Sequence, residues 1–380
     1  MPQTALHTGP TPHAPADSRA TELTGDALRH RALAAVAPLH VVSTLPFTKT
    51  PFWDEAVHTE PERWRGRGIA GLLSHIRGML AAAADADVVL VNGGERADLL
   101  YLAVAGLCPW IRAPHQINDA HWHAKGGMAG RLQRLILRLG RRIIDEVQPH
   151  SPEEVELYAH HFGLPRECIR PLPWSTSLQG YDIRRADPHE RIIVSGGHSY
   201  RDYPTLFEAV RRGGWTLEVG LPPSPATEQA LAHARGAPNI RVVGDWRIGD
   251  YWQKVANAHV FAMPIVPGLT RCTADQTLLN AMSFGTVVVA TDALSSRLYI
   301  RHGVNGFLVP EGDADAWQST LEHVFSLPEA AYRAIGAQAA ADVSRHHSEA
   351  DRLARTLLRA ADGAARRPRR TAAAEAGTSR

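Results

Sequence analysis

Two series of apolar strands that alternate with helical segments constrain this 380-residue chain more than any other feature. Residues 86–91 read Ala-Asp-Val-Val-Leu-Val and stop at Asn-Gly-Gly, and residues 286–290 read Thr-Val-Val-Val-Ala. Apolar runs without polar alternation are typical of parallel strands that are covered on both faces. Because helical patterns lie between the strands, the sequence predicts an α/β fold whose parallel sheets carry helices on both sides.

The strand–helix pattern stops once and then starts again. Pro171-Leu-Pro173 resists both helix and central strand, so we expect a linker between two Rossmann-like domains there. Asn305-Gly306 is a hairpin signal, and Asp313 is expected to cap a helix that runs to Phe325. The predicted strands are 40–45, 86–91, 110–113, 191–195, 215–219, 239–243, 259–264 and 286–290.

These patterns predict an N-terminal domain at 37–175 and a C-terminal domain at 176–345. A C-terminal helix at 346–362 is expected to pack back on the N-terminal domain. Residues 1–36 and 363–380 are expected to be disordered tails, because both ends are rich in Ala, Pro, Thr or Arg and lack apolar periodicity. Ligands of open α/β sheets bind beyond the carboxyl ends of the strands, so the cleft between the domains is the expected site.

Composition excludes several classes of protein. Lys and Arg number 41 against 39 Asp and Glu, and a net charge of +2 gives no reason to expect a nucleic-acid partner. No apolar run approaches the ~18 residues of a membrane span, and no secretory signal is visible. Three widely spaced cysteines argue against disulfides or a zinc site, and they favour the cytoplasm.

The segment from Thr270 to Asp292 carries the strongest candidate for phosphate binding. Thr273 and Gln276 have the spacing of a capping box, so a helix is expected to start there. The free N–H groups of Asp275, Gln276 and Thr277 would then suit a phosphate. An ordinary capped core helix is the alternative.

A second candidate segment follows the strand at 191–195. Gly196 and Gly197 permit close approach of a ligand to the backbone, Ser199 lies in the same turn, and Arg201 supplies a positive charge suited to a diphosphate. The segment lacks the dinucleotide pattern G-x-G-x-x-G. A tight turn in which Arg201 pairs with a nearby carboxylate is an equally good interpretation.

Histidines gather between residues 113 and 123, where His115, Asp119, His121 and His123 follow a predicted strand. Their spacing fits no standard zinc pattern, and a loop of solvated histidines is weighed equally with a catalytic role. No metal is predicted.

Four segments, taken in order, resemble the C-terminal domain of retaining glycosyltransferases of family 4. They are the two candidate segments above together with residues 257–264 (Asn-Ala-His-Val-Phe-Ala-Met-Pro) and residues 301–310 (Arg-His-Gly-Val-Asn-Gly-Phe-Leu-Val-Pro). The resemblance covers most of residues 190–330, and it extends loosely to residues 150–154 and 162–165. It implies the GT-B fold, with an acceptor-side N-terminal domain and a nucleotide-sugar-binding C-terminal domain.

The resemblance also assigns residue roles. Cys272 and Asn280 stand where the family has two glutamates that contact the donor sugar and the ribose, and His198 with Arg201 stands for the family's diphosphate-binding pair. Pro46-Phe47-Thr48 replaces a Gly-Gly pair near the first strand. His115 aligns with a histidine near the reacting sugar, with Asp119 and His121 as second choices. The implied donor-binding residues are Gly196, Gly197, His198, Ser199, Arg201, Cys272, Asp275, Gln276, Thr277 and Asn280, and the acceptor-side residues are Gly93, Gly94, Glu95 and Arg96.

The implied reaction transfers a sugar from a nucleoside diphosphate sugar to an acceptor hydroxyl with retention, without a metal, a further cofactor or a covalent intermediate. Two alternatives remain open. A sugar-nucleotide 2-epimerase on the same fold would release nucleotide without an acceptor. A non-catalytic sugar-nucleotide-binding partner protein is favoured by the loss of glutamate at Cys272 and Asn280.

Overall fold

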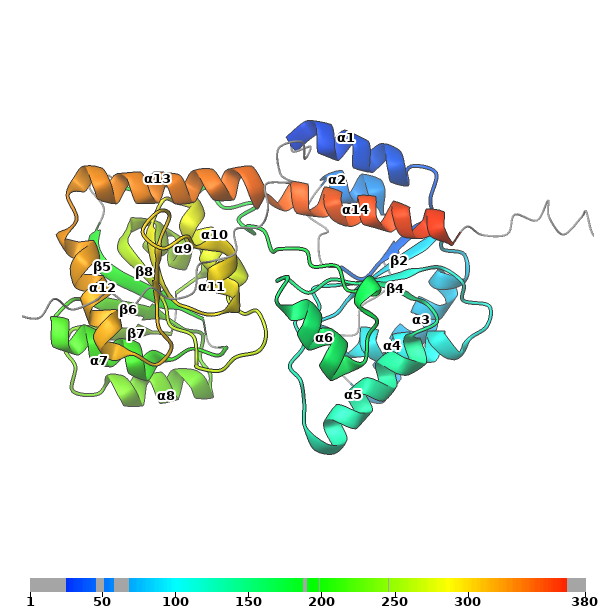
Figure 1. Ribbon diagram of the computed structural model, residues 1–380, viewed down its shortest axis with the longest axis horizontal. Coiled ribbons are helices and arrows are strands. Elements are labelled where there is room, and N and C mark those ends of the chain that lie inside the picture. The colour runs from blue at the N-terminus through cyan, green and yellow to red at the C-terminus, as the bar shows by residue number, and fades with distance from the viewer. Residues whose placement is uncertain are drawn as a thin grey trace, which may run out of the picture.

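The computed structural model describes residues 25–45, 51–57, 68–186, 190–197, 199–244 and 246–367. Two α/β domains, each built on a parallel sheet, lie next to each other and are joined by a linker and by the last two helices (Figure 1). His198, Pro46-Phe47-Thr48, and most of the predicted tails fall outside the described residues.

The N-terminal domain is built on a four-stranded parallel sheet in the order β1-β2-β3-β4. Each crossover joins neighbouring strands and advances in one direction, so right-handed connections place α3, α4 and α5 on one face. Helices α1, α2 and α14 cover the other face (Figure 1). The elements are α1 (Gly25–Val36), β1 (Val41–Ser43), α2 (Pro51–Ala56), α3 (Gly68–Ala84), β2 (Val88–Asn92), α4 (Arg96–Leu107), β3 (His115–Asn118), α5 (Gly127–Gly140), β4 (Ile144–Val147), α6 (Glu154–Phe162) and a 3-10 turn (Arg166–Cys168).

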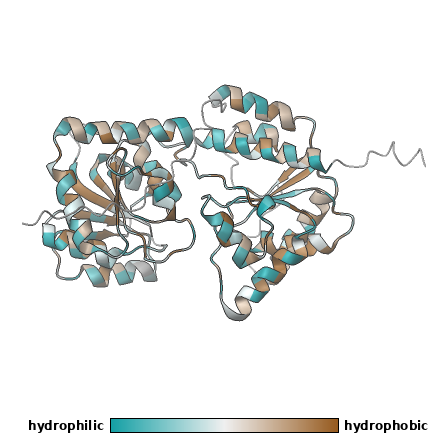
Figure 2. Cartoon of the chain, viewed as in Figure 1, coloured by the Kyte–Doolittle hydropathy of each residue, from teal (hydrophilic) through white to brown (hydrophobic). Residues whose placement is uncertain are grey.

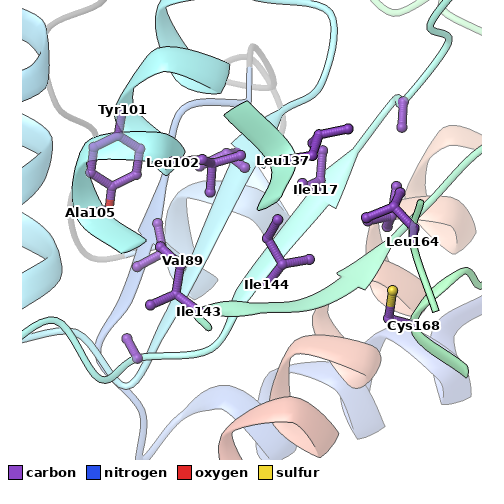
Figure 3. Packing of buried hydrophobic residues seen from close by; sticks show 14 of the residues in the cluster. Val89, Tyr101, Leu102, Ala105, Ile117, Leu137, Ile143, Ile144, Leu164 and Cys168 are labelled. Atoms are coloured by element: carbon purple, nitrogen blue, oxygen red, sulfur yellow. The ribbon is translucent and has the colours of Figure 1, made fainter. Parts of the chain in front are cut away.

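Alternate residues of each strand supply the two cores of this domain. Val89 and Val91 pack with Tyr101, Leu102 and the α3–α5 layer (Figure 3), whereas Val88 and Leu90 pack under α1 and α14. Burial of both faces explains why the strand sequence is continuously apolar, and the strands of both domains are brown in Figure 2.

The C-terminal domain has a six-stranded parallel sheet in the order β10-β9-β8-β5-β6-β7. The chain moves outward in one direction from β5 to β7 and in the other from β8 to β10, so the topological switch point lies between β5 and β8. Ligands of such sheets bind outside the carboxyl ends of the strands at this point. The strands are β5 (Glu190–Gly196), β6 (Leu217–Gly220), β7 (Ile240–Val243), β8 (Ala258–Met263), β9 (Val287–Thr291) and β10 (Phe307–Val309).

Helices cover both faces of this sheet as well. Ile193 and Val260 face the layer of α7, α8 and α12, and their neighbours Val194 and Phe261 face the layer of α9, α10, α11 and α13. The helices are α7 (Tyr203–Gly213), α8 (Pro225–Ala234), α9 (Ile248–Asn257), α10 (Asp275–Ser283), α11 (Leu294–Tyr299), α12 (Ala314–Ser326) and α13 (Glu329–His346).

The chain crosses back to the N-terminal domain after α13. Helix α14 (Glu349–Arg366) packs Leu353 and Leu357 into the core formed with α1 and β2 (Figure 1). At the crossing point the backbone N–H of Thr176 donates to the carbonyl of His347, at 3.0 Å. Two chain segments therefore connect the domains at nearly the same place.

Three local predictions are wrong and one is confirmed. Residues 25–36, expected in a disordered tail, form α1, because Leu28, Ala32 and Val36 are buried against α14. The strand expected at 110–113 begins only at His115. Asn305-Gly306 makes no hairpin, since β10 pairs parallel with β9. Asp313 caps α12 as predicted, its side chain accepting from the Ala316 N–H at 2.8 Å.

Helices long and apolar enough to cross a bilayer are absent from the described residues.

Candidate active site between the domains

The two segments predicted to bind the donor meet at the switch point of the C-terminal sheet. The loop after β5 and the loop after β8 are joined by two hydrogen bonds, from Val266 N–H to the carbonyl of Tyr200 (3.1 Å) and from Asp202 N–H to that of Pro264 (3.3 Å). Tyr200 also lies under the guanidinium of Arg271, 4.9 Å from the ring centroid. The predicted ligand site therefore lies at the topological switch point, where open α/β sheets commonly bind ligands.

Arg201 is a half-buried cation that lacks a carboxylate partner among the described residues. Its Nε donates to the carbonyl of Gly196 (3.2 Å) and its Nη1 to that of Ser199 (2.6 Å). Burial lowers the pKa of this guanidinium, and Tyr203, Tyr251 and Asp275 oppose the shift. The alternative in which Arg201 pairs with a nearby carboxylate is not what the structure shows, and its charge is available to an anion.

Tyr251 of α9 places a second unpaired polar group beside Arg201. Its side chain is only 9% exposed, and its hydroxyl has no hydrogen-bond partner in the described part of the chain. A Cβ atom on Gly196 would lie 2.4 Å from this hydroxyl, and one on Gly197 would lie 2.7 Å from Nη2 of Arg201. The two glycines thus leave room for the donor pair, as we call Arg201 and Tyr251.

Helix α10 begins differently from the prediction. Its N-cap is Ala274 in a left-handed conformation (φ 70°), and no side chain caps the helix. The capping box predicted from Thr273 and Gln276 is therefore wrong, because the Thr273 N–H donates instead to the hydroxyl of Ser295 at 2.7 Å. Asp275 is the first helical residue, so its carboxylate lies at the positive end of the helix dipole.

Asp275 is part of a buried ionic cluster that spans the interface between the two domains. Its Oδ1 accepts from the hydroxyl of Tyr299 (2.9 Å), and its Oδ2 lies 3.5 Å from Nδ1 of His150 in the N-terminal domain. Burial favours the neutral forms of the His150 imidazole and the Asp275 carboxyl, but the contact between them has a larger effect on both pKa values. The pKa of His150 is raised and the pKa of Asp275 is lowered, as expected for an imidazolium–carboxylate pair.

Asp119 and Arg352 extend this cluster to the last helix. Asp119 follows β3 at a positive φ of 54°, lies 3.9 Å from Nε2 of His150, and is ion-paired with Arg352 of α14. The guanidinium of Arg352 also stacks on Trp174 of the linker, 4.3 Å from its ring. We call Asp119, His150, Asp275 and Arg352 the interdomain clamp.

Backbone strain is concentrated at this cleft. Asp119, Tyr200 and Ala274 are the three non-glycine residues with positive φ among those the structure describes, and each lies in a loop at a strand's carboxyl end. Such conformations cost of order 1–3 kcal/mol and cluster at functional sites.

Cys272 is buried against the N-terminal domain. Its backbone N–H donates to Oε1 of Glu154 (3.1 Å), whose Oε2 accepts from the N–H groups of His150 and Ser151. Burial raises the pKa of the Cys272 thiol, with the charges of Asp275 and Glu154 adding to it. A carboxylate therefore lies beside Cys272, and Glu154 supplies it from the other domain.

Asn280 and Gln276 contact the linker. Asn280 is fully buried, its Oδ1 accepts from the Ser177 N–H (3.0 Å), and its Nδ2 donates to the Ser177 hydroxyl (3.2 Å). Gln276 is exposed and bonds the same hydroxyl. Thr277 is half-buried in the first turn of α10. The amide of Asn280, predicted to reach a ribose, is thus already used to hold the linker.

The residues predicted on the acceptor side lie after β2, and Gly94 among them is next to His121. The Gly93 N–H donates to the carbonyl of Asn118 (2.6 Å), and a Cβ on Gly94 would lie 3.1 Å from the His121 ring. Glu95 and Arg96 are exposed at the start of α4. The carbonyl of His121 accepts from Arg271 (2.6 Å), so this loop also touches the C-terminal domain.

His115 lies elsewhere. It is the first residue of β3, at the amino end of the strand, and is fully buried. Its Nε2 is 2.6 Å from the Tyr101 hydroxyl and its Nδ1 is 2.8 Å from the carbonyl of Ala113. Burial lowers its pKa to about 4. The structure does not bring His115 to the cleft, and the misplaced strand at 110–113 explains the error.

Several cleft residues were missed from the sequence. His150 and Glu154 belong to a segment whose loose resemblance to the family was the available signal, and Arg271 lies within the 270–292 segment. No sequence signal marks Trp174, Tyr251, Tyr299 or Arg352, whose partners are distant in the chain. Across the described residues, no group of three or more His, Cys, Asp or Glu side chains is placed to hold a metal ion.

Comparison with known proteins agrees with this geometry. Residues 208–326 match the sequence model of the family described as "Glycosyl transferases group 1". No curated protein matches the chain in sequence. Among solved structures, a glycosyltransferase from Rickettsia africae superposes with a TM-score of 0.64 at 14% identity, covering 88% of this chain and 94% of that chain.

Two further structures align over similar lengths. Alr3699/HepE of Anabaena, in complex with UDP and glucose, gives a TM-score of 0.62 at 14% identity over 89% of this chain and 95% of its own. Sucrose-phosphate synthase from Thermosynechococcus elongatus gives 0.62 at 18% identity over 89% and 92%. The chain therefore has the GT-B fold of two Rossmann-like domains, and its residues 208–326 match the group 1 glycosyl transferases.

Proposed function

We propose that this protein transfers a sugar from a nucleoside diphosphate sugar to an acceptor hydroxyl, with retention of configuration. The donor pair is the observation that carries the proposal. A half-buried guanidinium and a buried phenol lie at the switch point, against two glycines, and the described residues offer no carboxylate to the first and no hydrogen-bond partner to the second. Arg201 has carbonyl partners but no opposite charge, and the Tyr251 hydroxyl has no partner at all in the described residues, so a diphosphate would complete both groups.

The remaining roles follow from position. Arg201 and the N–H groups of the first turn of α10 stabilise the departing diphosphate, and electrostatic stabilisation of this kind is usually the largest contribution to catalysis. His121, a second choice for the catalytic role that the resemblance gave to His115, takes that role here, since it lies beside Gly94 at the domain interface. Both carboxylates of the clamp are ion-paired, which fits a route without a protein nucleophile. We propose no metal and no cofactor beyond the nucleotide sugar.

Location is part of the proposal. Cys108, Cys168 and Cys272 are all free thiols. Unpaired cysteines favour a reducing compartment, so we place the protein in the cytoplasm.

A thermal-shift screen with UDP, GDP, ADP, dTDP and CMP tests the donor site. A ligand at one hundred times its dissociation constant adds about 2.7 kcal/mol to the free energy of unfolding. We expect one nucleoside diphosphate to stabilise the protein selectively and Arg201→Ala to abolish the shift. Arg235→Ala, which removes an exposed arginine from the same domain, should leave the shift intact. Equal shifts in both variants would refute the assignment of Arg201.

A non-catalytic sugar-nucleotide-binding protein is the second candidate. Cys272 and Asn280, which replace the two glutamates of the family, are buried and engaged by Glu154 and Ser177. Such a protein would bind the nucleotide sugar with no release of nucleotide. Nucleotide release that needs an acceptor supports the transferase, whereas release without any acceptor supports a 2-epimerase.

A further inference from the structure

One outer face of the N-terminal domain is unusually apolar. Helices α3, α4 and α5 form one layer, because their three crossovers share one hand and one direction. Their outward side chains include large hydrophobic residues, of which Met128 is 85%, Ile69 77% and Leu107 66% exposed. The full set, which we call the α3–α5 face, is Ile69, Leu73, Leu100, Val104, Leu107, Trp110, Met128, Leu132 and Leu135.

These side chains are regularly spaced and not scattered. Leu100, Val104 and Leu107 follow a helical spacing of four and three residues along α4, and Met128, Leu132 and Leu135 repeat it along α5. Contiguous exposed apolar surface of this kind marks an interaction site. None of the large exposed hydrophobics belongs to the described parts of α1, α2 or α14, on the opposite face of the same sheet.

The apolar residues of α5 are interleaved with basic ones. Residues 120–144 contain six Lys or Arg and no Asp or Glu. Arg131, Arg134 and Arg138 are exposed, and none forms an ion pair with a carboxylate of the described residues. Brown and teal segments alternate along α5 in Figure 2. A basic polar face beside an apolar one is the signature of a helix that lies in a membrane interface.

We propose that the α3–α5 face docks on an anionic lipid bilayer. Arg131, Arg134 and Arg138 would contact anionic headgroups while Met128, Leu132 and Leu135 enter the boundary between headgroups and acyl chains. Charge favours this occupant over a second copy of the chain. A symmetric dimer would place the unpaired arginines of α5 near those of its partner, and like charges repel.

Vesicle sedimentation of the full-length protein tests the proposal. The probes are vesicles of phosphatidylcholine alone and vesicles with about one third phosphatidylglycerol. We expect binding to the anionic vesicles, weakened by high salt, and little binding to the neutral ones. Each basic residue near an anionic surface contributes on the order of a five-fold gain in partitioning. Arg131→Glu with Arg134→Glu should therefore lower partitioning at least about 25-fold.

Two more variants separate the apolar contribution from charge and from folding. Leu132→Ser with Leu135→Ser should also lower partitioning by about ten-fold or more, since each substitution removes a large apolar side chain that would enter the bilayer on docking. Leu231→Ser and Arg235→Glu change matched exposed residues of the other domain and should bind like wild type. Because all substituted residues are exposed, the thermal midpoints should stay within a few degrees of wild type.

The proposal is overturned if the wild type stays in the supernatant with anionic vesicles or binds neutral vesicles equally well. It is also overturned if the control variants lose as much binding as the α5 variants. Light scattering tests the other occupant, a second copy of the chain. If the wild type is a dimer and the variant with Leu132→Ser and Leu135→Ser is a monomer, a second copy covers the α3–α5 face and the proposal is overturned.

Discussion

The interdomain clamp and the donor pair are two sets of buried polar groups at the same cleft. In the clamp every charge has an opposite charge beside it, since His150 lies between Asp119 and Asp275, and Arg352 pairs with Asp119. In the donor pair, Arg201 has carbonyl partners only and the Tyr251 hydroxyl has none in the described part of the chain.

This difference separates structure from ligand binding. Buried charges that lie beside opposite charges hold elements together even where, as at both ring nitrogens of His150, no hydrogen bond forms. Removing one of them leaves the others unpaired at a high cost. A half-buried cation with no carboxylate among the described residues, next to a buried hydroxyl with no partner there, leaves binding capacity for an anionic ligand. We therefore expect substitutions in the clamp to change stability, and substitutions in the donor pair to change binding.

Arg352→Met should produce the largest effect. It removes the cation that is ion-paired with the buried carboxylate of Asp119 and leaves that carboxylate only His150, 3.9 Å away. Breaking a buried pair in this way costs about 3–5 kcal/mol. Chemical denaturation followed by circular dichroism and by tryptophan fluorescence measures the loss. Adding Asp119→Asn should restore part of it, because the carboxylate left unpaired by Arg352→Met is then gone.

The matched control for Arg352→Met is Arg166→Met, which breaks the exposed pair with Glu156. Exposed pairs contribute little to stability. If the two methionine variants unfolded at the same denaturant concentration, the clamp would be no more than a surface contact, and the contrast with the donor pair would fail.

His150→Gln should give a smaller, pH-dependent effect. The folded pKa of His150 is raised above 6.5, so its stabilising contribution is fully present below that pH and is lost as pH rises through the folded pKa. The folded pKa of Asp275 is lowered below 3.8, so its contribution is lost only as pH falls further still. The difference in thermal midpoint between wild type and variant should be largest near pH 5–6 and should shrink at alkaline pH.

This difference distinguishes His150 from His115, another of the buried histidines. The pKa of His115 is about 4, so His115 destabilises both proteins equally as pH falls below 6.5. A gap that widened with rising pH would contradict a protonated His150 and leave the clamp without its central cation.

Much of the fold could be predicted because it depends on local pattern. Continuous apolar runs at 86–91 and 286–290 identified buried parallel strands, and Asp313 identified a helix start. The hairpin prediction failed because Asn305 bonds Arg301 and Tyr299 across its own loop, a contact that turn chemistry does not reveal. Helix α1 was missed because its burial depends on α14, more than 300 residues later.

The site was predictable only in part, for the same reason. Gly196, Gly197 and Arg201 lie in one short loop, and that loop was found. The clamp joins residues 119, 150, 275 and 352, whose proximity arises only when both domains and the last helix are assembled. His115 was misassigned because the strand was predicted at 110–113, which placed His115 in the loop after it, whereas β3 begins at His115 and buries it. Asp119 and His121 do lie in the loop after β3, as predicted.

Tyr251→Phe should have the smallest effect and the most informative one. Because the hydroxyl has no partner in the described part of the free protein, its removal should leave the unfolding midpoint unchanged or slightly higher. Affinity for the nucleoside diphosphate, measured by calorimetric titration, should fall about ten- to one-hundred-fold, which corresponds to the loss of one hydrogen bond to a charged group. Tyr203→Phe is the matched control, because its hydroxyl donates to the Gly197 carbonyl at 2.6 Å and its loss should cost about 1 kcal/mol of stability. A Tyr251→Phe variant that lost stability and kept its affinity would place Tyr251 with the clamp, as a structural residue, and would leave Arg201 as the only group of the donor pair that awaits a ligand.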